Sequence, residues 1–130
     1  MKYLPAIAGG LLGLMFLAGG AMFLLNLIPP EAQKAPTPGS AESLFMGAFA
    51  PTGYLHFVKA LELIGGLLLA IPKTRNLGLL VIGPILINIL AYHVFIMGGE
   101  GLFSPVLIVI SLLSAYLLWA ARRAFAGLLN

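Results

Sequence analysis

Apolar residues dominate four long stretches of the chain, and most polar residues lie between them. The apolar stretches cover about residues 4–28, 53–71, 77–97 and 102–121. Each is close to the roughly 20 residues that a helix needs to cross the hydrocarbon core of a bilayer. The pattern therefore predicts an all-α integral membrane protein. We expect one domain, residues 1–130, that forms a transmembrane four-helix bundle.

Proline and glycine mark the ends of these predicted spans. Pro5 suits the first turn of a helix, where its missing N–H costs nothing. Pro29 and Pro30 close the first span and Pro72 closes the second, because proline cannot continue a helix. The pair Gly98–Gly99 closes the third.

The first span also has features of a secretory signal peptide, namely a basic start, an apolar run and small residues. Its apolar run, however, continues through Met22, Phe23 and Leu24 to Ile28, which is longer than a signal core. We therefore expect it to be a retained membrane helix.

The connection at residues 29–52 is the only long one, and its start, PPEAQKAPTPGS, is rich in turn-forming residues. Ser40 can cap a short helix, with Glu42 in the first turn. Four apolar residues would share one face of that helix: Leu44, Phe45, Ala48 and Phe49. Such a helix would lie in the outer membrane interface, over the mouth of the bundle. The alternative is an irregular loop, and the sequence does not decide between them.

Composition supports the membrane class. Hydrophobic residues make up 61% of the chain and charged residues 8%, whereas soluble domains carry about 25% charged residues. The absence of cysteine excludes disulfides and thiolate metal sites. The net charge of +3 forms no basic face, so we expect no nucleic-acid partner.

The positions of the basic residues predict the orientation. With four spans, both termini and the loop between the second and third spans lie on one side. That side carries Lys2, Lys73, Arg75, Arg122 and Arg123, and the other side only Lys34. By the positive-inside rule, both termini are cytoplasmic and the connection at 29–52 is extracytoplasmic. We expect a multi-pass protein of the bacterial inner (plasma) membrane.

Lys59 and Glu62 lie inside the second apolar stretch. An ionisable residue within a span costs about 2.5–3.5 kcal/mol on insertion scales and usually faces a partner or a cavity. The i, i+3 spacing places the two side chains on one helix face, where they can neutralise each other.

The other strongly polar residues of the spans fall in the same, outer half of the bilayer. Counting 1.5 Å per residue, Glu62 and Asn88 both lie roughly 13 Å from the outer ends of their spans. His56 and Lys59 share an arc with Glu62, and His93 lies at nearly the same depth as Lys59. Tyr92 lies one turn beyond Asn88, and Asn26 lies at the outer end of the first span. Pro84, one turn before Asn88, is expected to bend the third span.

Two interpretations of this group remain open. The residues can line an outward-opening pocket (His56, Lys59, Glu62, Asn88, Tyr92, His93 and Asn26), or they can be polar contacts that hold the helices in register. A metal site is disfavoured, because H-x5-E is no recognised ligand motif and Lys59 would repel a cation. Haem ligation by His56 and His93 has no further support. No catalytic motif is present, so no catalytic residues are assigned.

Residues 53–95 resemble the DoxX-like family of small four-helix bacterial membrane proteins. The similarity rests on K-x-x-E-x-x-G-G from Lys59 to Gly66, the basic turn at Lys73 and Arg75, and P-x-x-x-N-x-x-x-x-H from Pro84 to His93. The end of the first span, MFLLNLIPP, also fits.

The resemblance implies a four-helix membrane fold and leaves the chemistry open. The family name derives from a subunit of a thiosulfate–quinone oxidoreductase, and relatives are linked to oxidative-stress complexes. Our leading hypothesis is a non-enzymatic accessory or binding protein whose pocket takes a lipid, a quinone or a partner helix. The alternatives are a quinone-linked oxidoreductase subunit, with His93 and Glu62 as proton carriers, and a small transporter that acts as a homo-oligomer. No cofactor is certain, and quinone is the candidate.

Overall fold

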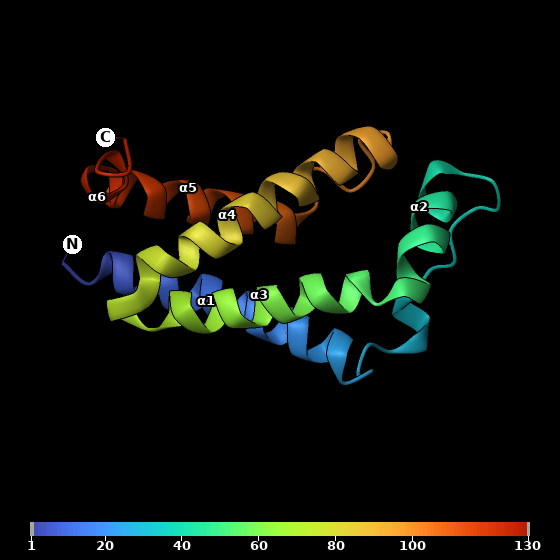
Figure 1. Ribbon diagram of the computed structural model, residues 1–130, viewed down its shortest axis with the longest axis horizontal. Helices are drawn as coiled ribbons and strands as arrows, with labels where there is room; N and C mark the ends of the chain where they lie inside the picture. The colour runs from blue at the N-terminus through green and yellow to red at the C-terminus, as the bar shows by residue number, and fades with distance from the viewer. Residues whose placement is uncertain (1, 130) are drawn as a thin grey trace.

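The computed structural model describes residues 2–129, and every regular element in that range is helical. The four longest helices are α1 (Leu4–Leu24), α3 (Tyr54–Ala70), α4 (Arg75–Ala91) and α5 (Pro105–Ala120). Two shorter helices, α2 (Ala41–Phe49) and α6 (Arg122–Ala126), lie at opposite ends of the molecule (Figure 1). Short single turns complete the chain: η1 (Pro30–Ala32), η2 (Ala50–Thr52), η3 (Pro72–Thr74) and η4 (Tyr92–Ile96).

Two continuous helices are long and apolar enough to cross a membrane. They are Leu4–Leu24, with 21 residues, and Pro72–Ile96, with 25 residues. A third is added if Ala41–Thr52 and Tyr54–Ala70, which meet at an angle of 81°, are counted as one broken span. The prediction of an all-helical membrane protein is therefore confirmed in this form: two or three apolar helices can cross a bilayer.

The outer surfaces of these helices are covered by large apolar side chains. Leu14 on α1, Ile87 on α4 and Leu112 on α5 are each more than 60% exposed. A water-soluble monomer rarely shows continuous apolar surface of this kind, whereas lipid tails cover it without cost. The exposed faces therefore fit a bilayer environment.

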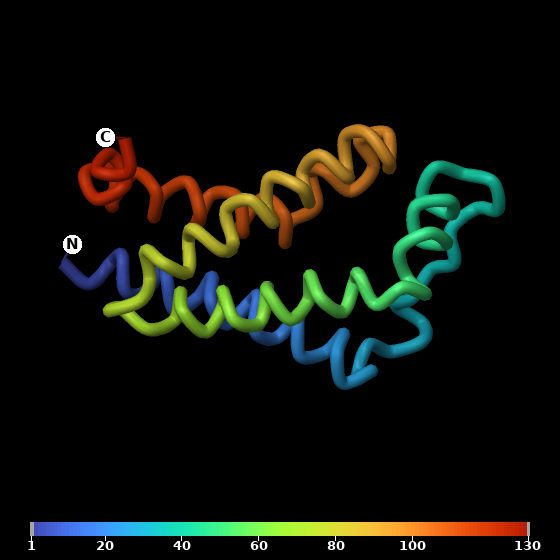
Figure 2. Tube along the Cα trace, viewed as in Figure 1, coloured from blue at the N-terminus to red at the C-terminus, as the bar shows by residue number. Residues whose placement is uncertain are grey.

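The long helices contact one another in a closed order. α1 packs along α3, α3 packs on α4, and α5 contacts both α4 and α1. In Figure 1 and Figure 2, α1 and α3 run side by side, while α4 leaves the turn at η3 and diverges from α3 toward the end that carries α2. The start of α1, the turn at η3 and helix α6 all lie at the other end. We call these the α2 end and the α6 end.

The buried core lies in the half of the molecule nearer the α6 end. Its members come from the first two thirds of α1, the end of α3, the first half of α4 and the end of α5: Ala8, Leu12, Phe16, Leu69, Leu79, Ile82 and Leu117. The helices are therefore tightly packed at the α6 end, and more open toward the α2 end.

Glycines bring the backbones together in this packed half. A Cβ added to Gly13 of α1 would lie 2.5 Å from the carbonyl oxygen of Gly66 in α3. A Cβ added to Gly78 of α4 would lie 2.6 Å from the amide nitrogen of Leu69. Small residues allow such close contact between membrane helices, where packing drives association. The α1–α3 and α3–α4 contacts therefore depend on having glycine, which has no side chain, at positions 13 and 78.

The first helix ends four residues earlier than the predicted boundary at residue 28. Asn26 has a left-handed backbone (φ 57°), and the amide of Leu27 donates to the carbonyl of Met22 while that of Asn26 donates to Phe23. These two bonds form a Schellman motif, which ends a helix at the residue before the left-handed one. Turn chemistry at Asn26, rather than Pro29 and Pro30, ends α1.

The connection at 29–52 contains a helix rather than an irregular loop. Ser40 Oγ accepts a hydrogen bond from the amide of Ser43, at 3.1 Å, and so caps α2 as its sequence predicts. Glu42 occupies the first turn. α2 then meets α3 at a sharp bend, where Gly53 has a left-handed backbone (φ 82°).

The third apolar stretch continues as a helix through Pro84 and ends in a turn of π-helix at η4. Gly98 and Gly99, predicted to close it, have positive φ angles of 65° and 92°. Ser104 then caps α5, and Pro105 occupies its first position. This second cap follows the same rule as Ser40 but was not predicted.

Gly13→Ala should destabilise the protein, because the new Cβ would collide with the backbone of α3 at Gly66. Overpacking of this kind typically costs about 1–3 kcal/mol. Gly10→Ala is the matched control, since no atom lies within 4 Å of its added Cβ. Unfolding in detergent should show a lower midpoint for Gly13→Ala alone; equal midpoints would contradict the close α1–α3 contact.

Candidate functional site

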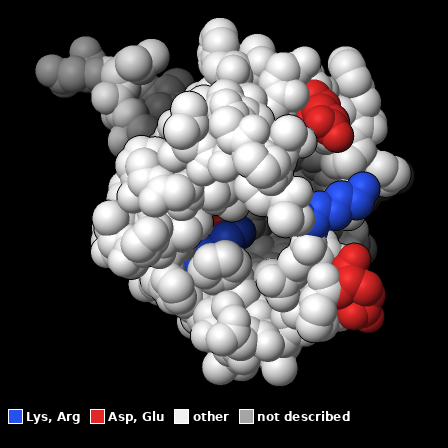
Figure 3. All heavy atoms as spheres, turned by 90° about the vertical axis from the view of Figure 1, so that its right-hand side faces the viewer, with Lys and Arg blue, Asp and Glu red and all other residues white. Residues whose placement is uncertain are grey.

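A cavity of about 700 Å³ lies in the open half of the molecule, between α3 and α4. The end of α1 and helix α2 complete its walls. Its lining is mainly apolar and aromatic, and the titratable or amide side chains within it are Tyr54, Lys59, Glu62, Asn88, Tyr92 and His93. Figure 3 shows the surface of the α2 end. A hollow opens in this surface, and basic and acidic atoms lie inside it.

The Lys59–Glu62 ion pair is the polar floor of this cavity. Nζ of Lys59 lies 3.0 Å from Oε2 of Glu62. Glu62 is the residue deepest along α3 that reaches the cavity, and its side chain is only 6% exposed, whereas that of Lys59 is 32% exposed. The i, i+3 spacing predicts this pairing, and the structure contains it.

The pair is held by charge rather than by a well-directed hydrogen bond. Oε2 of Glu62 is buried and lies close to Nζ of Lys59. The angles of this contact are nevertheless not those of a hydrogen bond. A buried carboxylate oxygen without a directed donor is costly, because it gives up its hydration. Glu62 therefore retains the capacity to accept a hydrogen bond from a molecule in the cavity.

Aromatic rings surround the ammonium group and the mouth of the cavity. Nζ of Lys59 lies 5.6 Å from the centre of the Phe23 ring, within the range of a cation–π contact. Phe45 and Phe49 of α2 contact Tyr92 and Tyr54, each pair with ring centres 5.0 Å apart. We call these four residues the aromatic rim. Phe45 and Phe49 were predicted to share one helix face, but neither they nor Phe23 and Tyr54 were predicted to line the pocket.

Asn88 lines the cavity, but its side chain bonds to its own helix. Its Nδ2 donates to the carbonyl of Pro84 at 3.0 Å. The carbonyl of Pro84 thus accepts a hydrogen bond from a side chain one turn further along α4. This bond uses one of the two N–H groups of Nδ2, so the second N–H and the amide oxygen are left for other partners.

His93 lies in the π-helical turn at the mouth. Its Nδ1 is 2.8 Å from the carbonyl of Ile89, so Nδ1 carries a proton and donates to that oxygen. In a neutral ring this leaves Nε2 as an acceptor. The ring packs edge-on against Tyr92, and its Nε2 lies near Gly101.

Two of the predicted pocket residues do not line this cavity. Asn26 is exposed beyond the end of α1, where it serves the Schellman motif. His56 is exposed on α3 and packs edge-on against Phe23, with ring centres 5.3 Å apart. The structure thus brings together Lys59, Glu62, Asn88, Tyr92 and His93 from the predicted set.

No group of three histidine, cysteine, aspartate or glutamate side chains gathers to hold a metal ion within residues 2–129. What the cavity offers is a large apolar and aromatic volume, one ion pair at its floor and hydrogen-bonding groups along one wall. This arrangement suits an amphiphilic molecule with a small polar group and a ring or chain.

The chain is 35% identical over 106 residues to "Uncharacterized protein YwoB" of Bacillus subtilis (strain 168). The match covers 78% of this chain and 63% of YwoB, so the chain spans less than two thirds of that relative. The name of YwoB states no activity. No protein-family profile matches the chain, and no solved structure does.

Lys59→Met should destabilise the protein more than Glu62→Gln. The first leaves a buried carboxylate unpaired, at a cost on the order of 3–5 kcal/mol. The second leaves the Lys59 side chain unpaired, but this side chain is already about one-third exposed and its ammonium group can reach water. The cost should therefore be only about 1 kcal/mol. Thermal unfolding in detergent measures both.

The double substitution should recover part of the loss, because no charge is then left unpaired. Additive losses in the double variant would mean that the two side chains are not energetically coupled.

Proposed function

We propose that the chain is a DoxX-like membrane protein whose four long helices all cross the bilayer. α3 and α5 have 17 and 16 residues, which correspond to about 25 Å and about 24 Å of helix. This is a few ångströms short of a typical hydrocarbon core, and flanking turns or local thinning can supply the difference. Their contacts with α1 and α4 along apolar faces support the same depth for all four.

The α6 end is, in this proposal, the cytoplasmic side of the bacterial plasma membrane. It holds the start of α1, the turn at η3 and helix α6, as an even number of spans requires (Figure 1). Five of the seven basic residues belong to these segments or directly adjoin them. The cavity then opens outward, and α2 lies over its mouth in the outer interface.

The proposed activity is non-enzymatic binding of an amphiphile, a quinone or a lipid, in the cavity between α3 and α4. The observation that carries it is an ion pair at the floor of a cavity of about 700 Å³ whose other walls are mainly apolar. The polar group of the ligand would meet Lys59 and Glu62, and its ring or chain would lie against the aromatic rim. A helix of a partner protein, inserted into the same cavity, is the alternative ligand.

A quinone-linked oxidoreductase subunit is the second candidate. It is favoured by one feature: two groups able to carry protons, Glu62 and His93, line the same cavity. In that case a bound quinone would exchange electrons with a redox partner of the chain. The ligand itself would be the same as in the binding proposal.

Val58→Trp should abolish ligand binding, because it places a large ring in the cavity that Val58 lines. Protein purified in mild detergent would be extracted, and its quinones and lipids quantified by mass spectrometry and absorbance. Wild type should retain about one amphiphile per chain, and a short-chain quinone added to stripped protein should raise its melting temperature.

Ile64→Trp is the control, since Ile64 lies on the same helix, is 52% exposed and does not line the cavity. It should bind as wild type does. No retained amphiphile and no response to quinone in the wild type would refute the binding proposal. Quinone bound by wild type and reduced by membranes that contain the chain, but not by membranes that lack it, would select the oxidoreductase.

Topology can be tested with reporter fusions. A reporter placed after Asn130 and one inserted in the turn at η3 should both be active in the cytoplasm, and one near Pro38 should be active outside. This follows from four spans and from the distribution of basic residues. An extracytoplasmic carboxyl terminus would rule out the four-span arrangement.

A further inference from the structure

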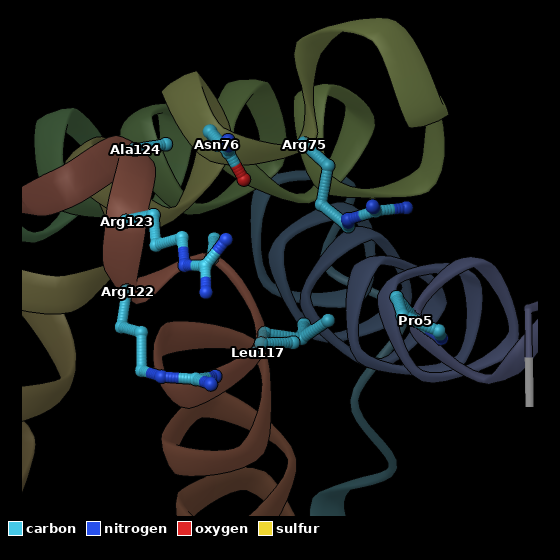
Figure 4. Close-up of a pocket in the computed structure, with 9 residues that line it drawn as sticks. Pro5, Arg75, Asn76, Leu117, Arg122, Arg123 and Ala124 are labelled. Atoms are coloured by element: carbon cyan, nitrogen blue, oxygen red, sulfur yellow. The ribbon is translucent and has the colours of Figure 1, made fainter.

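A second pocket, of about 450 Å³, lies at the α6 end. Four helices contribute to it: α1 through Pro5, α4 through Arg75 and Asn76, α5 through its last turn, and α6 through Arg122 and Arg123. Its lining contains no acidic residue. Figure 4 shows Arg122 and Arg123 extending from α6 on one side, with Asn76 and Arg75 above them and Pro5 opposite.

All three arginines of the chain line this pocket, and none of its four lysines does. Lys2 and Lys73 lie at the same end of the molecule but do not line the pocket. The positive-inside rule requires bases at this end, but it does not distinguish arginine from lysine or gather the bases in one hollow. Arginine differs in presenting a planar fork of donors that matches phosphate oxygens in pairs.

Contacts within the protein hold two of these arginines in place. The Arg75 side chain crosses Gly9 of α1: its Cδ lies 2.7 Å from where a Cβ of that glycine would stand. Arg122 stacks on the ring of Trp119 at 4.4 Å and donates from one guanidinium nitrogen to the carbonyl of Trp119. Its remaining donors are available to a ligand. Within residues 2–129, none of the three arginines forms an ion pair with an acidic side chain.

The surroundings of the pocket fit the depth of lipid headgroups. Trp119 is 61% exposed next to Arg122, and tryptophan is enriched at the membrane–water interface. Of the four acidic residues, Glu62 lines the cavity, and Glu31, Glu42 and Glu100 belong to connecting segments on the other side of the predicted topology. No aspartate or glutamate side chain therefore competes for the three guanidinium groups within residues 2–129.

We propose that this pocket binds the phosphate group of an anionic phospholipid from the leaflet at the α6 end. Arg75 and Arg123 would hold the phosphate oxygens from opposite sides, and Asn76 would add a hydrogen bond. The apolar wall formed by Pro5, Leu117 and Ala120 would contact the glycerol end of the chains. Basic pockets between membrane helices recognise headgroups in this way.

The test compares two double variants that each remove two positive charges from the same end. Arg75→Gln with Arg123→Gln removes pocket arginines, and Lys2→Gln with Lys73→Gln removes bases outside the pocket. Each full-length protein would be placed in nanodiscs of phosphatidylcholine alone or of phosphatidylcholine with phosphatidylglycerol. Native mass spectrometry then counts retained phosphatidylglycerol, and titration gives its affinity.

Wild type and the lysine double variant should retain phosphatidylglycerol over phosphatidylcholine. The arginine double variant should bind phosphatidylglycerol about tenfold more weakly or worse, because two charge-assisted contacts are lost. Arg75→Lys with Arg123→Lys should fall between them, since it keeps the charge without the fork. This last variant protects the test against misfolding of the glutamine variant.

Three results would overturn the proposal. They are equal losses in the arginine and lysine variants, equal retention of both lipids by wild type, and displacement of phosphatidylglycerol by inorganic phosphate at equal concentration, which would assign the pocket to a free anion. Because this pocket and the cavity at the α2 end share no lining residue, failure here leaves the amphiphile proposal unaffected.

Discussion

Close backbone contact among three helices is the constraint on which the rest of the structure depends. Gly13 meets Gly66, and Gly78 meets the backbone of α3 at Leu69, so α1, α3 and α4 are pinned together in the half near the α6 end. Helices that touch at one end and cross at an angle must separate at the other. The core therefore lies near the α6 end, and a cavity lies between α3 and α4 near the α2 end.

The separation of α3 and α4 determines the electrostatics of Glu62. This carboxylate lies where the two helices begin to diverge, so packing covers it, while Lys59, one turn nearer the mouth, is partly exposed. The pair is neutral as a unit but asymmetric in its access to water. In the proposed binding mode, a ligand would meet the ammonium group of Lys59 first and the poorly solvated carboxylate of Glu62 behind it.

The two ends of the molecule differ in their charge chemistry. The α2 end has one buried ion pair beneath aromatic rings, which suits an amphiphile with a small polar group. The α6 end has three arginines around a hollow without acidic residues, which suits a phosphate. Both pockets include residues of α4, so this helix extends between the two sites and its position relative to α3 shapes both.

Several features of this protein could be predicted from local sequence signals. Hydrophobic length predicts the helical membrane class, Ser40 predicts the cap of α2, and the i, i+3 spacing predicts the Lys59–Glu62 pair. Each of these depends on residues within one turn of helix or on composition, so no knowledge of distant parts of the chain is needed. Asn26 carried a local signal too, since asparagine favours the left-handed backbone that ends α1, but the following prolines obscured it.

The tertiary structure decided which side chains share a cavity. Depth along a span placed Asn26, His56 and Asn88 together with Glu62, yet Asn26 and His56 do not line the cavity, and the amide nitrogen of Asn88 bonds to its own helix. The places of Phe23 and Tyr54 in the cavity lining, and the gathering of all three arginines around one hollow, also had no signal in the sequence order. The physical reason is that the rotation and divergence of packed helices are set by contacts between residues far apart in the chain, and hydrophobic pattern alone carries no information about which faces those contacts select.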